Sequence, residues 1–173
     1  MARSFRAGRR LGAAFGIGLA ALLAACASPP PPPPPTQVVL TLTATPDVNP
    51  TPSGQGAPIV LRVYQLASTS GFTGAEFFDL FNNDQATLKS DLVKRDDVTL
   101  APGQSKTLTL SPSDQVKSVG VFAGYRDYAN ATWRVTADIP PHKTTRITVQ
   151  AGRTKLAIPP PPAAPAAGAQ PGS

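Results

Sequence analysis

Short segments in which apolar and polar residues alternate recur through residues 38–158 of this chain. In the first segment, Val38, Leu40 and Leu42 occupy alternate positions, which places them on one face of an extended strand. Seven or eight such segments are separated by turns rich in proline and glycine, with no strand–helix–strand repeat between them. That pattern predicts a mostly β fold, an antiparallel two-sheet sandwich. The expected strands cover residues 38–45, 59–66, 98–100, 107–110, 118–126, 133–139, 147–150 and 156–158.

Glycines mark the points where the backbone of these strands is expected to be special. Residues 101–104 read Ala-Pro-Gly-Gln, with proline and glycine at the central positions that a type II turn prefers. We expect strands 98–100 and 107–110 to form a hairpin across this turn. Gly120 and Gly124 lie within a later strand, where they predict a bulge or a close approach of another part of the chain.

A helix is expected between the second and third strands. Thr73 and Glu76 have the spacing of a capping box, in which each side chain hydrogen-bonds the backbone of the other residue. Phe72 and Phe77 stand at the positions of a hydrophobic staple around that cap. The sequence therefore predicts a short helix over residues 74–81.

A further helical turn or two is expected after this helix, since Leu88 and Leu92 share a helical face. The whole helical insert then spans about residues 73–92. Its phenylalanines are expected to pack against a sheet, because an aromatic cluster in an insert of this kind is far more often core than ligand site.

The N-terminus has the features of an export signal. Four arginines precede an apolar run over residues 11–21, which is shorter than the about 20 residues that a membrane-spanning helix needs. Small residues follow the run and lead to Cys26, the single cysteine of the chain. We therefore expect residues 1–25 to be a signal peptide.

Cys26 closes the sequence Leu-Ala-Ala-Cys, which resembles a bacterial lipobox. The resemblance implies a covalent diacylglyceryl group on the thiol, cleavage before Cys26 and an N-acyl chain on the new amine. Ala27 follows where an aspartate would imply retention at the inner membrane, so the resemblance implies the outer membrane. The alternative is an ordinary signal peptide cut at an Ala-x-Ala site, with Cys26 left as an incidental free thiol.

Proline-rich segments flank the expected sandwich, which covers residues 38–158. Residues 26–37 contain seven consecutive prolines, which favour a polyproline II spacer of roughly 22 Å at about 3.1 Å per residue. The alternative for this segment is low-complexity sequence with no length requirement. Residues 159–173 are rich in proline and alanine and are expected to form a disordered tail.

The net charge of the chain gives no reason to expect nucleic acid as a partner. Four of its sixteen basic residues lie in the expected signal peptide, so the remainder carries twelve basic against ten acidic residues, a net charge of +2. No run of five or more basic residues occurs. The 148 residues that follow the expected cleavage site suit a single domain.

Few residues of this chain could do chemistry. His142 is the single histidine and stands in an expected exposed turn, so neither a hydrolytic triad nor a zinc site is indicated. Asp79, Asn82 and Asp84 lack the glycine and the terminal glutamate of a calcium loop. We therefore expect a protein that is not an enzyme, with no metal, no cofactor and no small-molecule substrate.

A set of short motifs occurs in one order along residues 49–134. Together the motifs resemble the TssJ family, the outer-membrane lipoproteins of bacterial type VI secretion. In sequence order they are Pro58, Arg62-Val63-Tyr64-Gln65-Leu66, Phe72, Phe77-Phe78, Leu80, Leu88, Asp91-Leu92, Pro102-Gly103, Val119-Gly120-Val121, Tyr125-Arg126-Asp127 and Ala131-Thr132-Trp133-Arg134.

The resemblance implies a transthyretin-like sandwich with a helical insert. It also implies a structural role, in which a protein anchored by lipid on the periplasmic face of the outer membrane binds the periplasmic domain of a TssM-like inner-membrane protein. The part of the family associated with that contact is the long loop between the first two strands, residues 46–57 here. We expect the contact to be made by Asp47, Val48, Asn49, Thr51, Ser53 and Gln55.

The rival interpretation is a periplasmic lipoprotein that binds carbohydrate or peptidoglycan. Such a protein would expose aromatic side chains along one face of the sandwich. Candidates for that face are Tyr64, Phe122, Tyr125 and Tyr128.

Overall fold

The computed structural model describes residues 31–160. The predicted signal peptide, Cys26 and all but the first two residues of the predicted tail lie outside the described residues. The chain divides into two units, residues 1–33 and 34–173, and the second contains every strand and helix described here. No helix within residues 31–160 is long and apolar enough to cross a bilayer.

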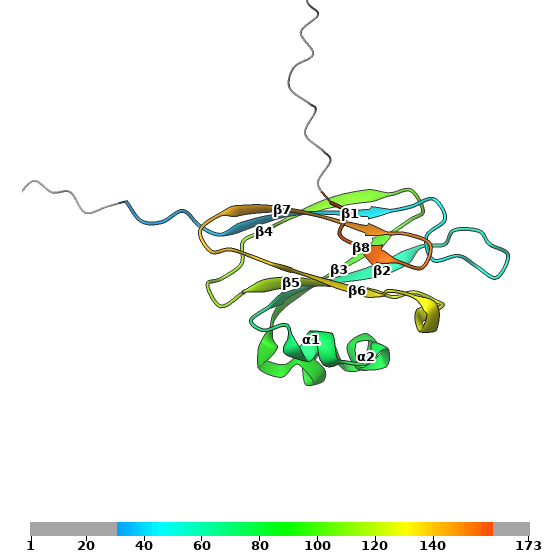
Figure 1. Cartoon of the computed structure of the whole chain (residues 1–173), viewed down its shortest axis with the longest axis horizontal. Helices are drawn as coiled ribbons and strands as arrows, with labels where there is room; N and C mark the ends of the chain where they lie inside the picture. The colour runs from blue at the N-terminus through cyan, green and yellow to red at the C-terminus, as the bar shows by residue number, and fades with distance from the viewer. Residues whose placement is uncertain (1–30, 161–173) are drawn as a thin grey trace, which may run out of the picture. The chain divides into compact units, whose positions relative to one another are not determined.

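The second unit contains two four-stranded sheets that pack face to face (Figure 1). The strand order is β4-β1-β7-β8 in one sheet and β3-β2-β5-β6 in the other. The predicted two-sheet sandwich is therefore confirmed. The strands are β1 (Gln37–Ala44), β2 (Ile59–Leu66), β3 (Leu92–Leu100), β4 (Ser105–Leu110), β5 (Ser118–Ala123), β6 (Arg134–Asp138), β7 (Thr144–Ala151) and β8 (Leu156–Ala157).

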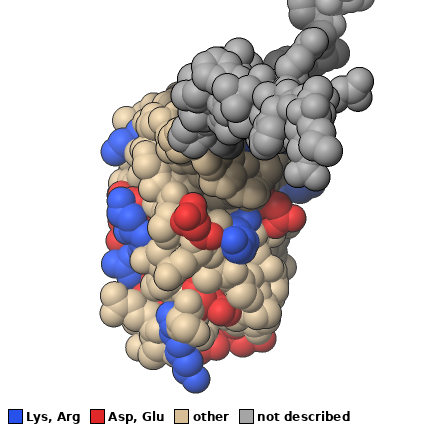
Figure 2. Space-filling model, turned by 90° about the vertical axis from the view of Figure 1, so that its left-hand side faces the viewer, with Lys and Arg blue, Asp and Glu red and all other residues tan. Residues whose placement is uncertain are grey.

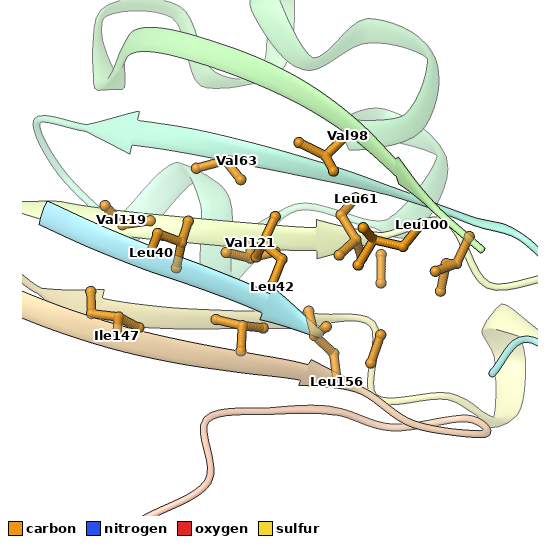
Figure 3. Close-up of a cluster of buried hydrophobic side chains, with 14 of the residues drawn as sticks. Leu40, Leu42, Leu61, Val63, Val98, Leu100, Val119, Val121, Ile147 and Leu156 are labelled. Carbon is orange, nitrogen blue, oxygen red and sulfur yellow. The ribbon is translucent and has the colours of Figure 1, made fainter. Parts of the chain in front are cut away.

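The main core lies between the two sheets, where the apolar face of each strand turns inward (Figure 3). Val38, Leu40 and Leu42 of β1 are fully buried, as their alternation predicts. They meet Leu61 of β2 and Val121 of β5 in a single apolar cluster. Burial of this surface is the main favourable contribution to the folded state.

One strand pair departs from the antiparallel prediction. β1 pairs with β4 in antiparallel fashion, but it pairs with β7 in parallel, with Leu40 opposite Ile147. The chain passes through the other sheet between β1 and β7, so β7 returns in the same direction as β1. Alternation of side chains is the same in both kinds of pairing, and the sequence pattern therefore could not reveal this direction.

The predicted hairpin between the third and fourth strands is wrong, although its turn is present. Gly103 has a φ of 76°, and the N–H of Gln104 donates to the carbonyl of Ala101 at 3.0 Å. The turn carries the chain from one sheet to the other, since β3 pairs with β2 whereas β4 pairs with β1. The N–H of Ala44 donates to Gln104 O at 2.8 Å, which fixes the turn against the end of β1.

A helical insert is present, but its first turn is not where the capping box placed it. Three segments make up the insert: α1 (Ser70–Gly74), α2 (Phe77–Leu88) and the 3-10 turn η2 (Lys89–Asp91). Thr73 lies inside α1, and its hydroxyl donates back to the carbonyl of Thr69 at 3.0 Å. Glu76 is the N-cap of α2 and makes no side-chain capping bond. The predicted capping box is therefore wrong. Of the helix predicted over 74–81, residues 77–81 are helical, as the first part of the longer α2, whereas the predicted start is wrong.

The chain breaks between α1 and α2 because Ala75 has an extended backbone, with φ −73° and ψ 149°. Phe72 and Phe77 fall on different helices as a result. Phe72 packs on Tyr64, while Phe77 packs on Phe122. The two phenylalanines are core residues, as expected, but they do not form the predicted staple.

The helices cover the outer face of the β3-β2-β5-β6 sheet (Figure 1) and create a second apolar cluster there. β5 is buried at all six positions because one of its faces meets the other sheet and the other meets the helices. At Gly120 a Cβ would lie 3.0 Å from side-chain atoms of both Leu66 and Phe72. The predicted close approach at Gly120 is therefore confirmed.

Candidate partner-binding site

The connection between β1 and β2 projects beyond the sandwich at the end where β1 finishes (Figure 1). Its base is held inside the fold by Val48 and Asn49, whose exposed fractions are 0% and 7%. The side-chain amide of Asn49 donates to Pro58 O at 2.9 Å, and its oxygen accepts from the N–H of Arg126 at 2.8 Å. Asn49 has a φ of 47°, a conformation that asparagine tolerates better than most residues.

The burial of these two residues corrects part of the predicted contact surface. Val48 belongs to the main core, and both polar ends of the Asn49 side chain are used within the protein. Neither side chain is available to a partner in this conformation. Asp47, Ser53 and Gln55 are exposed, so the partner role remains a prediction for these residues and for half-buried Thr51.

Residues 50–56 form the exposed end of the loop, which we call the loop tip. The N–H of Thr51 donates to the carbonyl of Gln55 and the N–H of Gly54 donates to the carbonyl of Thr51, both at 2.8 Å. The hydroxyls of Thr51 and Ser53 lie 2.8 Å apart, and the N–H of Gln55 donates to the Thr51 hydroxyl at 3.2 Å. These bonds close the tip on itself, so that it has one defined shape.

The two sides of the loop approach closely below the tip. The N–H of Ala57 donates to Val48 O at 2.9 Å, which pairs the two sides. A Cβ at Gly56 would overlap the carbonyl oxygen of Pro46, so only glycine fits there. Asp47 is held at the outside of the loop by a 2.7 Å hydrogen bond from the hydroxyl of Thr45.

The loop and residues 34–36 lie at opposite ends of β1 (Figure 1). Gln37 begins the strand and Ala44 ends it, which separates the two ends by roughly 25 Å at about 3.3 Å per residue. At the entry end, the hydroxyl of Thr36 accepts from the N–H of His142 at 2.9 Å, and a ring nitrogen of His142 lies 3.1 Å from Pro34 O.

A buried charged cluster joins α2 to the sheet, and the sequence analysis did not predict it. Asp84 accepts from the Tyr64 hydroxyl at 3.0 Å and from Arg95 at 2.7 Å, and Arg62 lies 3.6 Å away. Burial alone would raise the pKa of Asp84, but the hydrogen bonds from Arg95 and Tyr64 and the charges of both arginines outweigh it and lower that pKa. Burial and the neighbouring Asp84 carboxylate raise the pKa of Tyr64.

Arg62 of this cluster also stabilises a kink in α2. The helix leaves helical geometry at Asn83, where φ is −137° and ψ is 35°. One guanidinium nitrogen of Arg62 donates to the carbonyls of Leu80 and Phe81, each at 2.8 Å. Insertion of a side chain into the hydrogen-bond ladder is a recognised cause of such kinks. Arg62, the one charged residue of the mostly apolar strand β2, was the sequence signal for this role.

A carbohydrate platform built on the predicted aromatic residues is not present in the described part of the chain. Residues 31–160 contain no group of three or more potential metal ligands. Tyr64, Phe122 and Tyr125 are all buried, and of the four aromatic candidates for a sugar-binding face Tyr128 alone is exposed. Figure 2 shows acidic and basic side chains interspersed on the visible face, with no broad area of one charge.

Comparison with known proteins supports one interpretation. Residues 36–154 match the family described as "Type VI secretion lipoprotein, VasD, EvfM, TssJ, VC_A0113". The crystal structure of the T6SS lipoprotein TssJ1 from Pseudomonas aeruginosa is 38% identical over 76% of this chain and 100% of that chain, with a TM-score of 0.71. Among curated proteins no sequence matches.

Two further solved structures are similar. Serratia marcescens Lip, a membrane-bound component of the type VI secretion system, is 28% identical over 73% of this chain and 98% of its own, with a TM-score of 0.69. A chain in a structure described as the T6SS protein TssM C-terminal domain from EAEC is 30% identical over 70% of this chain and 98% of its own, with a TM-score of 0.60. The family match spans most of the described residues, and this chain belongs to the TssJ family of type VI secretion lipoproteins.

Proposed function

We propose that this lipoprotein fastens the membrane complex of a type VI secretion system to the outer membrane. In this proposal lipid on Cys26 holds the chain on the periplasmic face of that membrane. The loop tip binds the periplasmic domain of a TssM-like inner-membrane protein. Membership of a type VI secretion lipoprotein family and the similarity to a chain in a TssM structure support the choice of partner.

The observation that carries the proposal is the shape of the loop tip. A polar loop of this length is usually either functional or disordered. This loop is ordered by its own hydrogen bonds and by a buried base at Val48 and Asn49, yet Pro52, Ser53 and Gln55 remain exposed. A loop that already has its bound shape loses little conformational entropy when it docks, which favours affinity.

The position of the tip suits a protein that connects two membranes. Two or more acyl chains are needed for stable anchoring, since each buried CH₂ contributes about 0.8 kcal/mol and one chain binds only reversibly. The lipid expected on Cys26 would provide such chains at the N-terminal side. The loop tip lies at the end of β1 opposite to Gln37, the residue at which the strand begins.

A loop variant and titration calorimetry test the proposal. The variant must leave Val48 and Asn49 unchanged, because both side chains are buried at the base of the loop. The replacement is therefore confined to the loop tip. In the tip variant, Thr51–Gln55 are replaced by Asn-Gly in a soluble chain that begins at Ala27. This variant should retain the melting temperature of the unchanged protein. Its affinity for the periplasmic domain of the TssM-like protein should fall at least tenfold, which is about 1.4 kcal/mol.

The matched control changes an exposed loop at the opposite end of the sandwich. The control is the double variant Asp114→Ala, Gln115→Ala. Both residues lie in the loop between β4 and β5, and both side chains are exposed. This variant should bind the TssM-like domain as tightly as the unchanged protein. A folded tip variant with undiminished affinity would show that the loop tip is not the contact.

A further inference from the structure

An exposed aromatic surface lies beside the loop, and the proposed function does not use it. Six large hydrophobic side chains within residues 31–160 are more than a third exposed. Four of them gather on the outer side of the β3-β2-β5-β6 sheet: Val60 at 39%, Phe78 at 49%, Phe81 at 41% and Tyr128 at 37%. We call these four residues the aromatic patch.

The rings of the aromatic patch share one buried neighbour. Phe77 stacks on Tyr128, with centroids 4.6 Å apart and planes at 19°, and on Phe81 at 5.8 Å and 12°. Phe78 meets Tyr128 edge to face at 4.9 Å. Three exposed rings therefore pack around Phe77, which itself rests on Phe122 of the sheet.

Val60 extends the aromatic patch toward the loop. The carbonyl of Val60 accepts from the N–H of Gly124 at 2.9 Å. A Cβ at Gly124 would lie 3.7 Å from a ring carbon of Phe81 and 3.9 Å from Cβ of Val60. Val60 is the second residue of β2 after the loop, so the apolar surface is continuous from the helices to the base of the loop.

The patch is held in a fixed shape before any partner arrives. The Arg62 guanidinium lies 5.5 Å from the centroid of the Phe81 ring and is itself fixed by two helix carbonyls. Tyr128 belongs to the 3-10 turn η3 (Tyr128–Asn130), where the Asn130 amide donates to the Asp127 carboxylate at 2.9 Å. Rigid aromatic side chains that remain exposed are typical of interaction sites rather than of ordinary surface.

Acidic residues border the aromatic patch. Glu76 is the N-cap of α2 and Asp79 stands in its first turn, so the two flank Phe77 and Phe78 in the sequence. Asp127 directly precedes Tyr128. All three side chains are exposed, and none joins an ion pair with another residue of the described part. An apolar surface with an acidic border is complementary to a segment that carries apolar side chains flanked by lysine or arginine.

Backbone contacts connect the patch with the loop. Arg126, two residues before Tyr128, donates its N–H to the Asn49 side chain at the base of the loop. The N–H of Gly124, in the same segment as Arg126, donates to the carbonyl of Val60, which follows the loop in β2. A protein seated on the loop tip would thus find the patch on the adjoining surface.

We infer that the aromatic patch is a second contact surface for the protein that binds the loop tip, and that it receives a basic segment of that protein with apolar side chains. The inference rests on the proposed function for the identity of the partner. In this arrangement the loop tip fixes the orientation of the partner, while Phe78 and Tyr128 bury apolar surface against it. The acidic border selects the charge of the segment.

Titration of single variants with the periplasmic domain of the TssM-like protein tests the inference. Phe78→Ser and Tyr128→Ser should each weaken binding by about tenfold or more, as expected for aromatic residues at the centre of an interface. Val93→Ser and Ile158→Ser remove hydrophobic side chains that are 38% and 40% exposed and lie outside the patch. These two controls should change the affinity by less than about twofold.

A charge series tests the proposed character of the segment. Glu76→Gln with Asp79→Asn should weaken binding at low salt and reduce the dependence of affinity on ionic strength, because screening acts on the charges removed. Asp114→Asn, an exposed acid at the other end of the sandwich, should alter neither quantity. An unchanged salt dependence in the double variant would overturn the basic character assigned to the segment.

The tip variant separates this inference from the proposed function. Loss of binding in the tip variant with unchanged binding in both patch variants overturns the second contact and leaves the proposed function intact. Unchanged binding in all variants overturns both. Weakened binding in the patch variants alone supports the patch and removes the loop tip from the contact.

Two further readouts keep the test decisive. Tyr128→Ser removes a ring stacked on Phe77, so its melting temperature must be compared with that of the controls. If Tyr128→Ser is unstable, Phe78→Ser alone decides, because Phe78 is half exposed. Binding of soluble peptidoglycan fragments that Phe78→Ser abolishes, with unchanged affinity for the protein, would overturn the inference in favour of a sugar site.

Discussion

The side chain of Asn49 accepts a 2.8 Å hydrogen bond from the backbone N–H of Arg126, and this bond ties the long loop to the segment that follows β5. The same side chain donates to Pro58 O at 2.9 Å, so its amide bridges three parts of the chain. Asn49 is therefore a structural residue within the loop. Its role explains why the polar connection can project and still keep one shape.

Replacement of Asn49 should destabilise the whole domain. Asn49→Ala leaves two backbone groups without their partner, at about 1–3 kcal/mol for each buried group. Alanine at a φ of 47° adds roughly 1 kcal/mol of strain. Both hydrogen bonds are only partly buried, so we expect a total loss near the lower end of this sum, about 3–4 kcal/mol, in urea denaturation. Gln55→Ala at the exposed tip should stay within about 0.5 kcal/mol. A stable Asn49→Ala protein would show that the loop does not depend on this bridge.

The lipid anchor depends on a single atom, the sulfur of Cys26. Cys26→Ser removes the thiol that the lipobox resemblance assigns to diacylglyceryl transfer, so the variant should be neither lipidated nor cleaved before residue 26. Metabolic labelling with a fatty acid and fractionation of the two membranes measure both effects. Continued labelling and recovery of the variant with the outer membrane would rule out the anchor at this residue.

The observed helix boundaries give Thr73 and Phe77 different importance for the stability of the insert. Thr73 no longer caps a helix, and its exposed hydroxyl only bonds back within α1, so Thr73→Ala should change stability by less than about 0.5 kcal/mol. Phe77 lies under three exposed rings and against the sheet, so Phe77→Ala should cost about 3–5 kcal/mol. Urea melts of both variants measure the difference. Equal losses would contradict the placement of α2.

The sequence predicted those features that depend on local periodicity. The alternation at Val38, Leu40 and Leu42 identifies a strand and its inward face because side chains in a strand alternate regardless of the partner. The glycine of the type II turn at Gly103 was predictable for the same reason, since its positive φ is a property of four consecutive residues. Both predictions are confirmed.

Features that depend on distant partners were not predictable from the same patterns. The direction of β7 beside β1 and the separation of β3 from β4 follow from the path of the chain between sheets, which no local motif encodes. Asn49 looks like a solvated loop residue in the sequence. Its burial depends on Arg126, which lies 77 residues further along the chain.

The error at the capping box has a local cause. Thr69 and Ser70 lie one helical turn before Thr73, and both positions could begin a helix. The structure uses Thr69 as the N-cap of α1 and Glu76 as the N-cap of α2. The observed start points allow Phe72 and Phe77 to be buried on separate helices. This packing against the sheet is a tertiary property, and it overrides the local capping signal.

The acid stability of the domain should depend on Asp84. Burial opposes its charge, but hydrogen bonds from Arg95 and Tyr64 and the nearby arginines lower its pKa in the folded state. The unfolded chain then binds a proton more readily, with a pKa of about 3.9, so this contribution is complete above that pH and is lost as the pH falls through the folded pKa. The difference in unfolding free energy between Asp84→Asn and the unchanged protein should therefore be smallest in strong acid.

Urea melts at several pH values measure this effect. At pH 7, Asp84→Asn should lose about 2–3 kcal/mol, less than the about 3–5 kcal/mol of a fully buried pair because Arg95 is partly exposed. Asp97→Asn is the control, since its side chain contacts the same two arginines but is 47% exposed. This change should cost less than about 1 kcal/mol. A constant difference between Asp84→Asn and the unchanged protein from pH 7 to pH 2 would contradict the pKa assignment.

Two glycines four residues apart provide a direct test of how α1 packs on the sheet. A Cβ at Gly120 would lie 3.0 Å from Leu66 and from the ring of Phe72, which is tighter than ordinary contact, so Gly120→Ala forces α1 away from β5. Overpacking of this kind costs about 1–3 kcal/mol. At Gly124 the nearest atom to a Cβ, Val60 O, is 3.6 Å away, and Gly124→Ala should therefore stay within about 0.5 kcal/mol. Because the backbone change is the same in both variants, any larger loss for Gly120→Ala measures the packing of Phe72, and equal stabilities would place Phe72 elsewhere.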